Sequence, residues 1–386
     1  MFDSTIEFIR ALYDASPGNV IPLHAPTFAG NERKYLEECI DTTFVSSVGA
    51  FVDRFEQMIA EYTGAAGAVV TVNGTAALHM ALMLAGVERG DLVITQALTF
   101  IATCNAIAYT GADPVFVDVD HDTMGLSPDA LEQWLADNTI RNAAGECIHT
   151  ATRRRVRACV VMHTFGHPAR VERLLEICRA YGIELVEDAA ESIGSLRAGR
   201  HTGTFAPIGA LSFNGNKTIT TGGGGMLLFS DAEMARHAKH LTTQAKVPHR
   251  WEFVHDSVGY NYRMPNINAA LGCAQLEQLP DFLRSKRATA SEYADFFADG
   301  HDGIRFMPEP AGTQSNYWLC AIELPDRDAR DAFLTATNDA GVMTRPIWEL
   351  MNRLPMWQDA ISDDLTVTRR LADTIVNLPS GVRAAK

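Results

Sequence analysis

The sequence of 386 residues contains no apolar run that approaches the roughly 18 to 20 residues needed for a membrane-spanning helix. Its first residues, Met1 to Glu7, lack the basic and then apolar start of a signal peptide. The seven cysteines are scattered and form no CxxC pair, which is typical of reduced thiols. These absences predict a cytoplasmic protein without a membrane segment.

Basic residues are outnumbered, since 33 Lys and Arg stand against 47 Asp and Glu and the formal net charge is -14. A nucleic-acid partner needs a basic face, and this balance argues against one. A small anionic substrate remains compatible, because a few arginines can make a local positive pocket. With 47% hydrophobic residues the chain can bury a large core, which predicts two domains or one large domain with an appendage.

Short apolar runs that alternate with helical segments predict a mostly parallel sheet covered by helices on both faces. The runs expected to be strands are 68–72, 91–96, 115–119, 156–162, 183–188, 208–213 and 226–229. The long helical region 266–297 leads to a smaller C-terminal part, in which Ser315–Leu319 and Ile322 are expected to form a strand. We expect a large domain with an N-terminal arm over residues 1–265 and a small domain over residues 266–386.

A lysine lies on the connection between the last two of these runs. Ser212-Phe213-Asn214-Gly215-Asn216-Lys217 ends the run that starts at Ile208, and glycines follow before Met226. Burying a lysine removes water from its ammonium group and favours the neutral amine, which can form a Schiff base. From this stretch alone, a surface lysine on a hairpin loop fits equally well.

A carboxylate at the end of another run favours the Schiff base. The run that starts at Ile183 ends at Asp188. Pyridoxal phosphate (PLP) requires a lysine for its attachment and an anion at its pyridine nitrogen, so that the ring can act as an electron sink. Asp188 at a strand end fits the second requirement, although an aspartate in such a place can also be a helix N-cap.

A glycine turn before a helix provides a candidate anion site. Asn73-Gly74-Thr75 stands between the run that ends at Val72 and a segment of helical composition, Ala76–Ala85. Free backbone N–H groups point outward at a helix N-terminus, so a phosphate can bind there. Without further context, such a turn more often serves only as a helix cap.

Three motifs together resemble those of the DegT/DnrJ/EryC1/StrS family of PLP-dependent sugar aminotransferases. They are Glu187-Asp188-x-Ala190, Ser212-Phe213-x-x-x-Lys217 and Thr220-Thr221-Gly222-x-Gly224-Gly225, in the order and spacing of the family. The resemblance runs from about Ile21 to the C-terminus. It implies an α/β fold, the PLP-dependent transferase fold type I (aspartate aminotransferase-like), with a seven-stranded, mostly parallel sheet between helices and a smaller α+β C-terminal domain.

The resemblance also implies a role for each motif. Lys217 would carry the PLP as a Schiff base, and Asp188 would face the pyridine nitrogen. Gly74 and Thr75 would hold the phosphate with their turn, and the hydroxyl of Ser212 would be a further donor to it.

Three more residues complete the implied cofactor site. Phe100, in Thr99-Phe100-Ile101-Ala102-Thr103, is expected to stack on the pyridine ring, although an aromatic at a strand end is often plain core. Asn261 is expected to cross a dimer interface to the phosphate bound by the partner subunit, which implies a homodimer with shared active sites. Glu191 stands where the family often has Gln or His near the cofactor's face or O3′, and a glutamate there must be protonated or turned away.

Candidates for substrate contacts are Ser47, His163, Lys246 and Arg345. Ser47 lies in a turn that resembles the family's V-S-S-x-G near the substrate, and His163 opens a loop that in the family lies near the cofactor. Lys246 is at the end of a predicted helix. Arg345 can pair with a phosphate or carboxylate, or it can simply be solvated.

The pair His163 and His167 does not predict a metal site. The two residues are four apart, but Gly166 and Pro168 break the segment and no third ligand lies nearby in the sequence. We therefore expect no metal.

The implied reaction moves an amino group from L-glutamate, through the pyridoxamine form of the cofactor, to a nucleotide-linked keto sugar. One sub-group of the family makes UDP-4-amino-4,6-dideoxy-N-acetylglucosamine from the UDP-linked 4-keto-6-deoxy sugar, a C4 amination for surface-glycan biosynthesis. Thr344-Arg345-Pro346-x-Trp348, Leu354-Pro355-Met356 and the run Gly222–Gly225 resemble that sub-group.

Other functions are open on the same fold. A keto-sugar dehydratase of this family replaces the Schiff-base lysine with histidine, so Lys217 argues against it. A C3-aminotransferase would share the cofactor motifs. A non-catalytic regulatory homologue would have no use for Lys217 and Asp188, yet both are in place.

Overall fold

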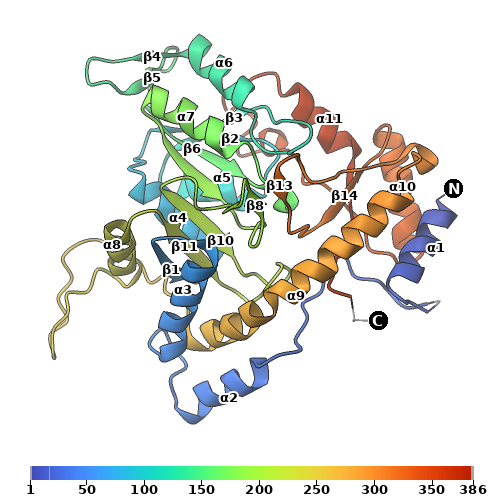
Figure 1. The fold of residues 1–386 in the computed structure, drawn as a ribbon. Helices are drawn as coiled ribbons and strands as arrows, with labels where there is room; N and C mark the ends of the chain where they lie inside the picture. Colours follow the sequence, from blue (N-terminus) through green and yellow to red (C-terminus); the bar gives the residue numbers. More distant parts are fainter. Residues whose placement is uncertain (1, 17, 384–386) are drawn as a thin grey trace.

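A seven-stranded sheet forms the centre of the chain (Figure 1). The computed structural model describes residues 2–16 and 18–383. The strand order is β1-β11-β10-β7-β6-β2-β3, and neighbours run parallel except at β11, which is antiparallel to both β1 and β10. The strands are β1 (Gly67–Thr71), β2 (Leu92–Gln96), β3 (Asp113–Val117), β6 (Val156–Met162), β7 (Glu184–Asp188), β10 (Ile208–Ser212) and β11 (Gly225–Phe229). The predicted mostly parallel sheet is confirmed.

Helices cover both faces of this sheet, because successive side chains of each strand point to opposite sides. One face packs against α4 (Gly74–Leu84), α5 (Ile101–Tyr109) and α8 (Ala232–Thr242). The helices on the other face are α3 (Ala50–Thr63), α6 (Pro128–Asn138), α7 (Val171–Tyr181) and α9 (Asn266–Phe296).

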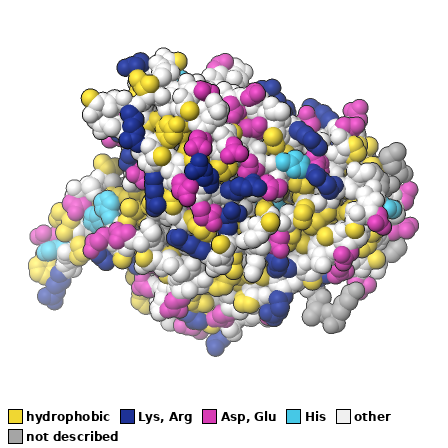
Figure 2. Space-filling view, turned by 45° about the horizontal axis from the view of Figure 1, so that its top comes forward, with side chains coloured by type: hydrophobic (Ala, Val, Ile, Leu, Met, Phe, Trp, Pro, Cys, Tyr) yellow, Lys and Arg dark blue, Asp and Glu magenta, His cyan; other side chains and the backbone are white. Residues whose placement is uncertain are grey.

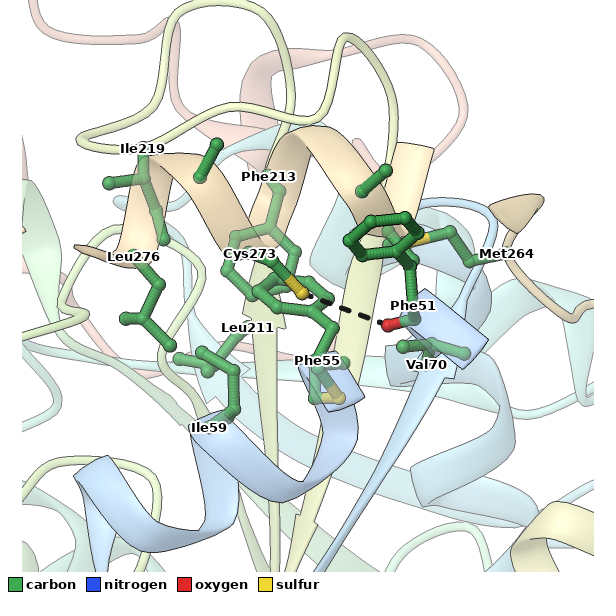
Figure 3. Packing of buried hydrophobic residues seen from close by; sticks show 14 of the residues in the cluster. Phe51, Phe55, Ile59, Val70, Leu211, Phe213, Ile219, Met264, Cys273 and Leu276 are labelled. Atoms are coloured by element: carbon green, nitrogen blue, oxygen red, sulfur yellow. Dashed lines mark hydrogen bonds between the residues drawn. The ribbon is translucent and has the colours of Figure 1, made fainter. Parts of the chain in front are cut away.

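The contact between α3, α9 and the sheet fixes the start of the loop that carries Lys217 (Figure 3). Phe213, the first residue after β10, is fully buried, and its ring centroid lies 5.1 Å from that of Phe55. On α9, Cys273 donates a hydrogen bond from Sγ to the carbonyl of Phe51 at 3.8 Å. The chain therefore leaves the core at a fixed point, one residue after β10.

A second sheet has the order β12-β14-β16-β15. Its strands and flanking helices are β12 (Arg305–Phe306), β14 (Cys320–Glu323), β15 (Arg345–Pro346), β16 (Ile375–Leu378), α10 (Arg327–Asp339) and α11 (Thr366–Thr374). Helix α1 (Asp3–Leu12) packs in the same cluster, where Phe2 and Ile9 join Phe333 and Val376. The N-terminal helix thus belongs with the second sheet by its packing, and the domain boundary after residue 265 stays a prediction.

The strand expected over Ser315–Leu319 and Ile322 is confirmed only at Ile322 and is wrong over Ser315–Leu319, because β14 begins at Cys320. Tyr317 has a φ of 45°, which a strand does not allow. The side chain of Asn316 donates to the carbonyls of Glu191 and Ile193, each at 2.9 Å. These tertiary hydrogen bonds hold the segment in a turn against the end of β7.

The remaining elements are short. They are α2 (Glu32–Asp41), β4 (Thr139–Arg141), β5 (Cys147–His149), β8 (Leu196–Arg197), β9 (Arg200–His201), β13 (Thr313–Gln314) and single 3-10 turns at Thr164–Gly166, His301–Gly303 and Met351–Arg353. Over residues 2–16 and 18–383, none of the helices is both long and apolar enough to cross a bilayer. Acidic and basic side chains are intermixed over the face shown in Figure 2.

Candidate active site

The predicted cofactor residues on β7, on β10 and at the start of α4 gather at one edge of the large sheet. Because β7 and β10 are parallel, their carboxyl ends meet there, with Asp188 opposite Ala210 and Ser212 two residues further on. Gly225 pairs with both Ser212 and Thr71, so the end of β1 lies at the same edge. The loop between β10 and β11 then brings Lys217 over this edge.

Asp188 is a buried carboxylate with two defined donors. Its Oδ2 accepts a hydrogen bond from Thr103 Oγ1 at 2.7 Å, and its Oδ1 accepts one from the backbone N–H of Ala190 at 3.2 Å. Burial raises the pKa of Asp188, while these hydrogen bonds and the ammonium of Lys217 offset part of that effect. A buried carboxylate held in this way is suited to a cationic partner such as a protonated pyridine nitrogen.

Lys217 is not a surface lysine, since only 11% of its side chain is exposed. Its Nζ lies 3.2 Å from Oε1 of Glu191 and 3.9 Å from the centroid of the Trp318 ring. The indole Nε1 of Trp318 in turn donates to the carbonyl of Asn216 at 2.6 Å. The amine is therefore held between a carboxylate and an aromatic face.

Glu191 is buried and turned toward this amine. Its second oxygen, Oε2, accepts a hydrogen bond from the backbone N–H of Phe165 at 2.9 Å. Burial raises the pKa of Glu191 to about 7, although Lys217 and the Phe165 N–H act to lower it and Asp188 adds to the increase. Glu191 is thus poised between its charged and neutral forms near neutral pH.

The start of α4 fits a phosphate. Asn73 caps the helix by accepting a hydrogen bond from Ala76 N at 2.8 Å, and the N–H groups of Gly74 and Thr75 lie in its first turn. A Cβ at Gly74 would lie 2.9 Å from Cβ and 3.1 Å from Oγ of Ser212, so the absence of a side chain lets the serine hydroxyl lie against the helix N-terminus.

Phe100 has an exposed ring, which its expected stacking role requires. It is the N-cap of α5, and 49% of the residue is exposed, so it is not plain core. Its ring meets Trp348 edge-on at a centroid distance of 6.3 Å. The ring of Phe100 is therefore free to contact a ligand, and its stacking on PLP stays a prediction. The donor Thr103 lies one turn further along α5.

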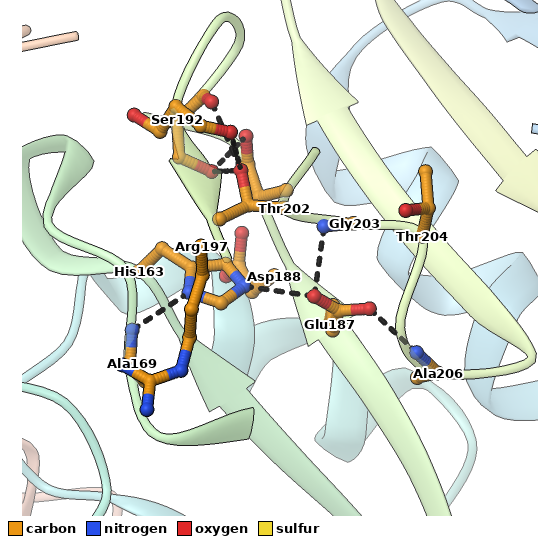
Figure 4. Close-up of polar contacts among 12 residues, drawn as sticks. His163, Ala169, Glu187, Asp188, Ser192, Arg197, Thr202, Gly203, Thr204 and Ala206 are labelled. Atoms are coloured by element: carbon orange, nitrogen blue, oxygen red, sulfur yellow. Dashed lines mark hydrogen bonds and ion pairs between the residues drawn. The ribbon is translucent and has the colours of Figure 1, made fainter. Parts of the chain in front are cut away.

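His163 is wrong as a direct substrate contact (Figure 4). The side chain of His163 is fully buried. Its Nε2 lies 3.0 Å from Oε2 of Glu187, and its Nδ1 accepts a hydrogen bond from the backbone N–H of Ala169 at 3.1 Å. Both ring nitrogens are therefore engaged. Glu187 also accepts from the N–H groups of Gly203 at 2.8 Å and Ala206 at 2.6 Å. Since Glu187 and Asp188 are adjacent on β7 and point to opposite faces, this pair supports the strand end from the side away from the cofactor.

The other substrate candidates are not brought to Lys217 within one chain. Among the contacts of residues 2–16 and 18–383, Arg345 donates to Asn338 Oδ1 at 2.8 Å and to Thr344 O at 2.7 Å. Lys246 is exposed, with Nζ 4.2 Å from the centroid of the Phe253 ring. Ser47 lies in a bend after α2, and the expected cofactor ligand Asn261 pairs with Thr243 in an isolated β-bridge, so their roles stay predictions.

Sequence reasoning missed Thr103, Trp318 and Asn316. Thr103 could have been found, because it ends the same motif that contains Phe100 and lies one helical turn beyond it. Trp318 and Asn316 carried no such signal, since they lie in the segment expected to be a strand.

Comparison with known proteins places the chain in a family. Residues 26–386 match the DegT/DnrJ/EryC1/StrS aminotransferase family. The chain is 36% identical over 361 residues to GDP-perosamine synthase of Escherichia coli O157:H7, and the match covers 93% of each protein. It is also 36% identical over 366 residues to the putative pyridoxal phosphate-dependent aminotransferase EpsN of Bacillus subtilis (strain 168), and this match covers 94% of the present chain and 91% of EpsN. The structure of the aminotransferase TlmJ from Streptoalloteichus hindustanus matches with a TM-score of 0.84 at 31% identity, covering 94% of both chains. The chain therefore belongs to the DegT/DnrJ/EryC1/StrS aminotransferase family and is a PLP-dependent sugar aminotransferase.

Proposed function

We propose that this enzyme transfers the amino group of L-glutamate to C4 of a nucleotide-linked 4-keto-6-deoxy sugar. The observation that carries the proposal is the position of Lys217, largely buried on the loop after β10 and above the strand end that holds Asp188. Bound PLP supplies an electron sink that lets a proton leave and return at carbon. Transamination needs an amine that can release the cofactor and then move that proton, and Lys217 has the position for both tasks.

The other residues orient the reacting parts. Asp188, held by Thr103, would keep the ring nitrogen protonated. Gly74, Thr75 and Ser212 would fix the phosphate end at the start of α4. These residues would hold the two ends of PLP, and Lys217 on the loop after β10 would form the attachment to it.

The proposal also concerns the nucleotide that carries the sugar. The residues near Arg345 and the glycine run predict UDP, as described above. The names of three relatives favour GDP instead: the GDP-perosamine synthases of Escherichia coli O157:H7, Caulobacter vibrioides and Vibrio cholerae are 36%, 34% and 33% identical to this chain. We therefore propose a GDP-linked acceptor first and a UDP-linked acceptor second, in the cytoplasm and in surface-glycan synthesis.

We further propose that a homodimer is the active unit. The segment after α8 projects from the rest of the chain in Figure 1 and carries Trp251, Phe253 and Val258, which are 68%, 80% and 80% exposed. Asn261 follows this segment. A second copy of the chain would cover these apolar side chains and receive Asn261 at its phosphate site.

Assays with purified protein, PLP and L-glutamate against GDP-, UDP- and dTDP-linked 4-keto-6-deoxy sugars test the reaction, with Lys217→Ala as the control. The proposal expects amination of at least one of these acceptors, and failure with every one of them would refute it. For the dimer, mixing inactive Lys217→Ala and Asn261→Ala chains should restore part of the activity, because one of the two shared sites is then intact. No recovery from mixed dimers would contradict shared sites.

A further inference from the structure

We infer that Glu191 is the base that takes a proton from Lys217 before this amine attacks a carbonyl carbon, and the acid that returns the proton when the amine leaves. The inference rests on the proposed function, because it concerns the same lysine. It gives a role to a residue that departs from the Gln or His common at this position.

The geometry favours direct proton transfer. An ammonium group has no lone pair, so Lys217 must lose a proton before it can act as a nucleophile. Oε1 of Glu191 lies 3.2 Å from Nζ, within reach of that proton. The carboxylate is fixed by the N–H of Phe165 on Oε2 and by Asn316, which donates to the backbone carbonyl of Glu191. The ring of Trp318 holds Nζ on another side.

The neighbouring titratable groups are less suited to this role. Asp188 also faces Glu191, but its two oxygens are engaged by Thr103 and by Ala190 N–H. Burial, then Lys286 and Lys217, lower the pKa of His24, and among the described residues neither of its ring nitrogens is hydrogen-bonded to the amine. Of the described groups, Glu191 is thus the carboxylate in hydrogen-bond contact with the amine.

The protons balance without another reactant. Lys217 passes one proton to Glu191, and the neutral amine attacks the aldehyde carbon of the cofactor. The two hydrogens left on nitrogen depart with the aldehyde oxygen as water when the C=N bond forms. Glu191 is then a neutral acid with no ammonium beside it, a form that burial favours. The pKa of about 7 for this carboxyl suits a base that works near neutral pH.

The test uses the full-length protein freed of cofactor, mixed with PLP between about pH 5.5 and 8.5 and quenched with borohydride at timed intervals. Peptide mass analysis then measures the rate at which Lys217 is modified. In the wild type, this rate should fall as the pH drops below about 7. In Glu191→Gln, the rate at about pH 8 should be about 100-fold lower, and the rate should change steadily with pH without the break near pH 7, because the amine then loses its proton only to solvent. Glu191→Asp should retain the fall with an intermediate rate.

The sign of the effect separates this role from simple charge pairing. If Glu191 only stabilised the ammonium, Glu191→Gln would leave more neutral amine and would react faster than the wild type. An equal or faster rate in Glu191→Gln therefore overturns the inference and leaves the proposed function intact. Failure of PLP to modify Lys217 in the wild type overturns the proposed function itself. The control Glu184→Gln, at the other end of β7 where Glu184 faces Arg157, should react like the wild type.

Discussion

Nζ of Lys217 lies 3.2 Å from Oε1 of Glu191, and the carboxylate is almost fully buried. The amine donates a hydrogen bond to the carboxylate at the edge of the large sheet. The ammonium of Lys217 lowers the pKa of Glu191, while burial raises it more, and the net increase underlies the first prediction.

The stability of the cofactor-free protein should depend on Glu191 between about pH 4.5 and 7. The pKa of Glu191 is raised from its ordinary 4.5 to about 7, so the folded chain holds a proton in a range where the unfolded chain has lost it. The stabilising contribution is complete below the lower value and is lost as the pH rises through the upper one. Relative to Glu191→Gln, the wild type should lose about 3 kcal/mol of unfolding free energy across this range. Urea titrations at several pH values measure this, and parallel pH profiles for the two proteins would contradict it.

Removing the charge of Asp188 should impair catalysis more than binding of the sugar. Asp188→Asn keeps the shape but loses the anion at the ring nitrogen, and we expect kcat to fall about 100-fold. Thr103→Val removes the donor that holds this carboxylate and should lower kcat about tenfold. Thr103→Ser keeps the hydroxyl and serves as the matched control. Unchanged kcat in Asp188→Asn would show that Asp188 does not face the cofactor.

The buried pair His163 and Glu187 should act on stability and not on substrate affinity. Glu187→Ala leaves His163 and the N–H groups of Gly203 and Ala206 without their acceptor, so the unfolding free energy should fall by about 3 to 5 kcal/mol. The KM values for glutamate and for the sugar should stay near those of the wild type in the fraction that folds. A large rise in KM with normal stability in His163→Ala would restore His163 as a substrate contact.

Phe100 should contribute to cofactor affinity through its exposed ring. Phe100→Ala removes the stacking surface at the start of α5, and we expect the Kd for PLP to rise about tenfold. Phe100→Tyr keeps the ring and should bind PLP like the wild type. Equilibrium dialysis against PLP gives both values, and equal affinities for the alanine and tyrosine variants would argue against stacking.

Much of the fold could be predicted because it depends on local signals. The sheet strands are apolar runs buried on both faces, and the glycine turn at Gly74 marks the start of α4. Asp188 could be predicted because it ends such a run, and Lys217 because it lies on the loop after another, so their places at the sheet edge follow from strand direction.

The wrong predictions concern segments whose conformation is determined by contacts with residues far away in the sequence. Ser315–Leu319 has the composition of a strand, but hydrogen bonds from Asn316 to the segment after β7 hold it in a turn. This turn places Trp318 over Lys217, which no local pattern could indicate. The orientation of His163 follows from the alternation of side chains along β6. His163 points to the same face of the sheet as Cys159 and Val161, whereas Asp188 points to the opposite face.

The absorption spectrum of the protein loaded with PLP tests the central claim most directly. The wild type should show a visible band that L-glutamate bleaches and that a keto-sugar acceptor restores. Lys217→Ala should lack this cycle. If Lys217→Ala retained a band that glutamate bleaches and moved amino groups at the wild-type rate, the assignment of Lys217 as the cofactor-binding amine would be wrong.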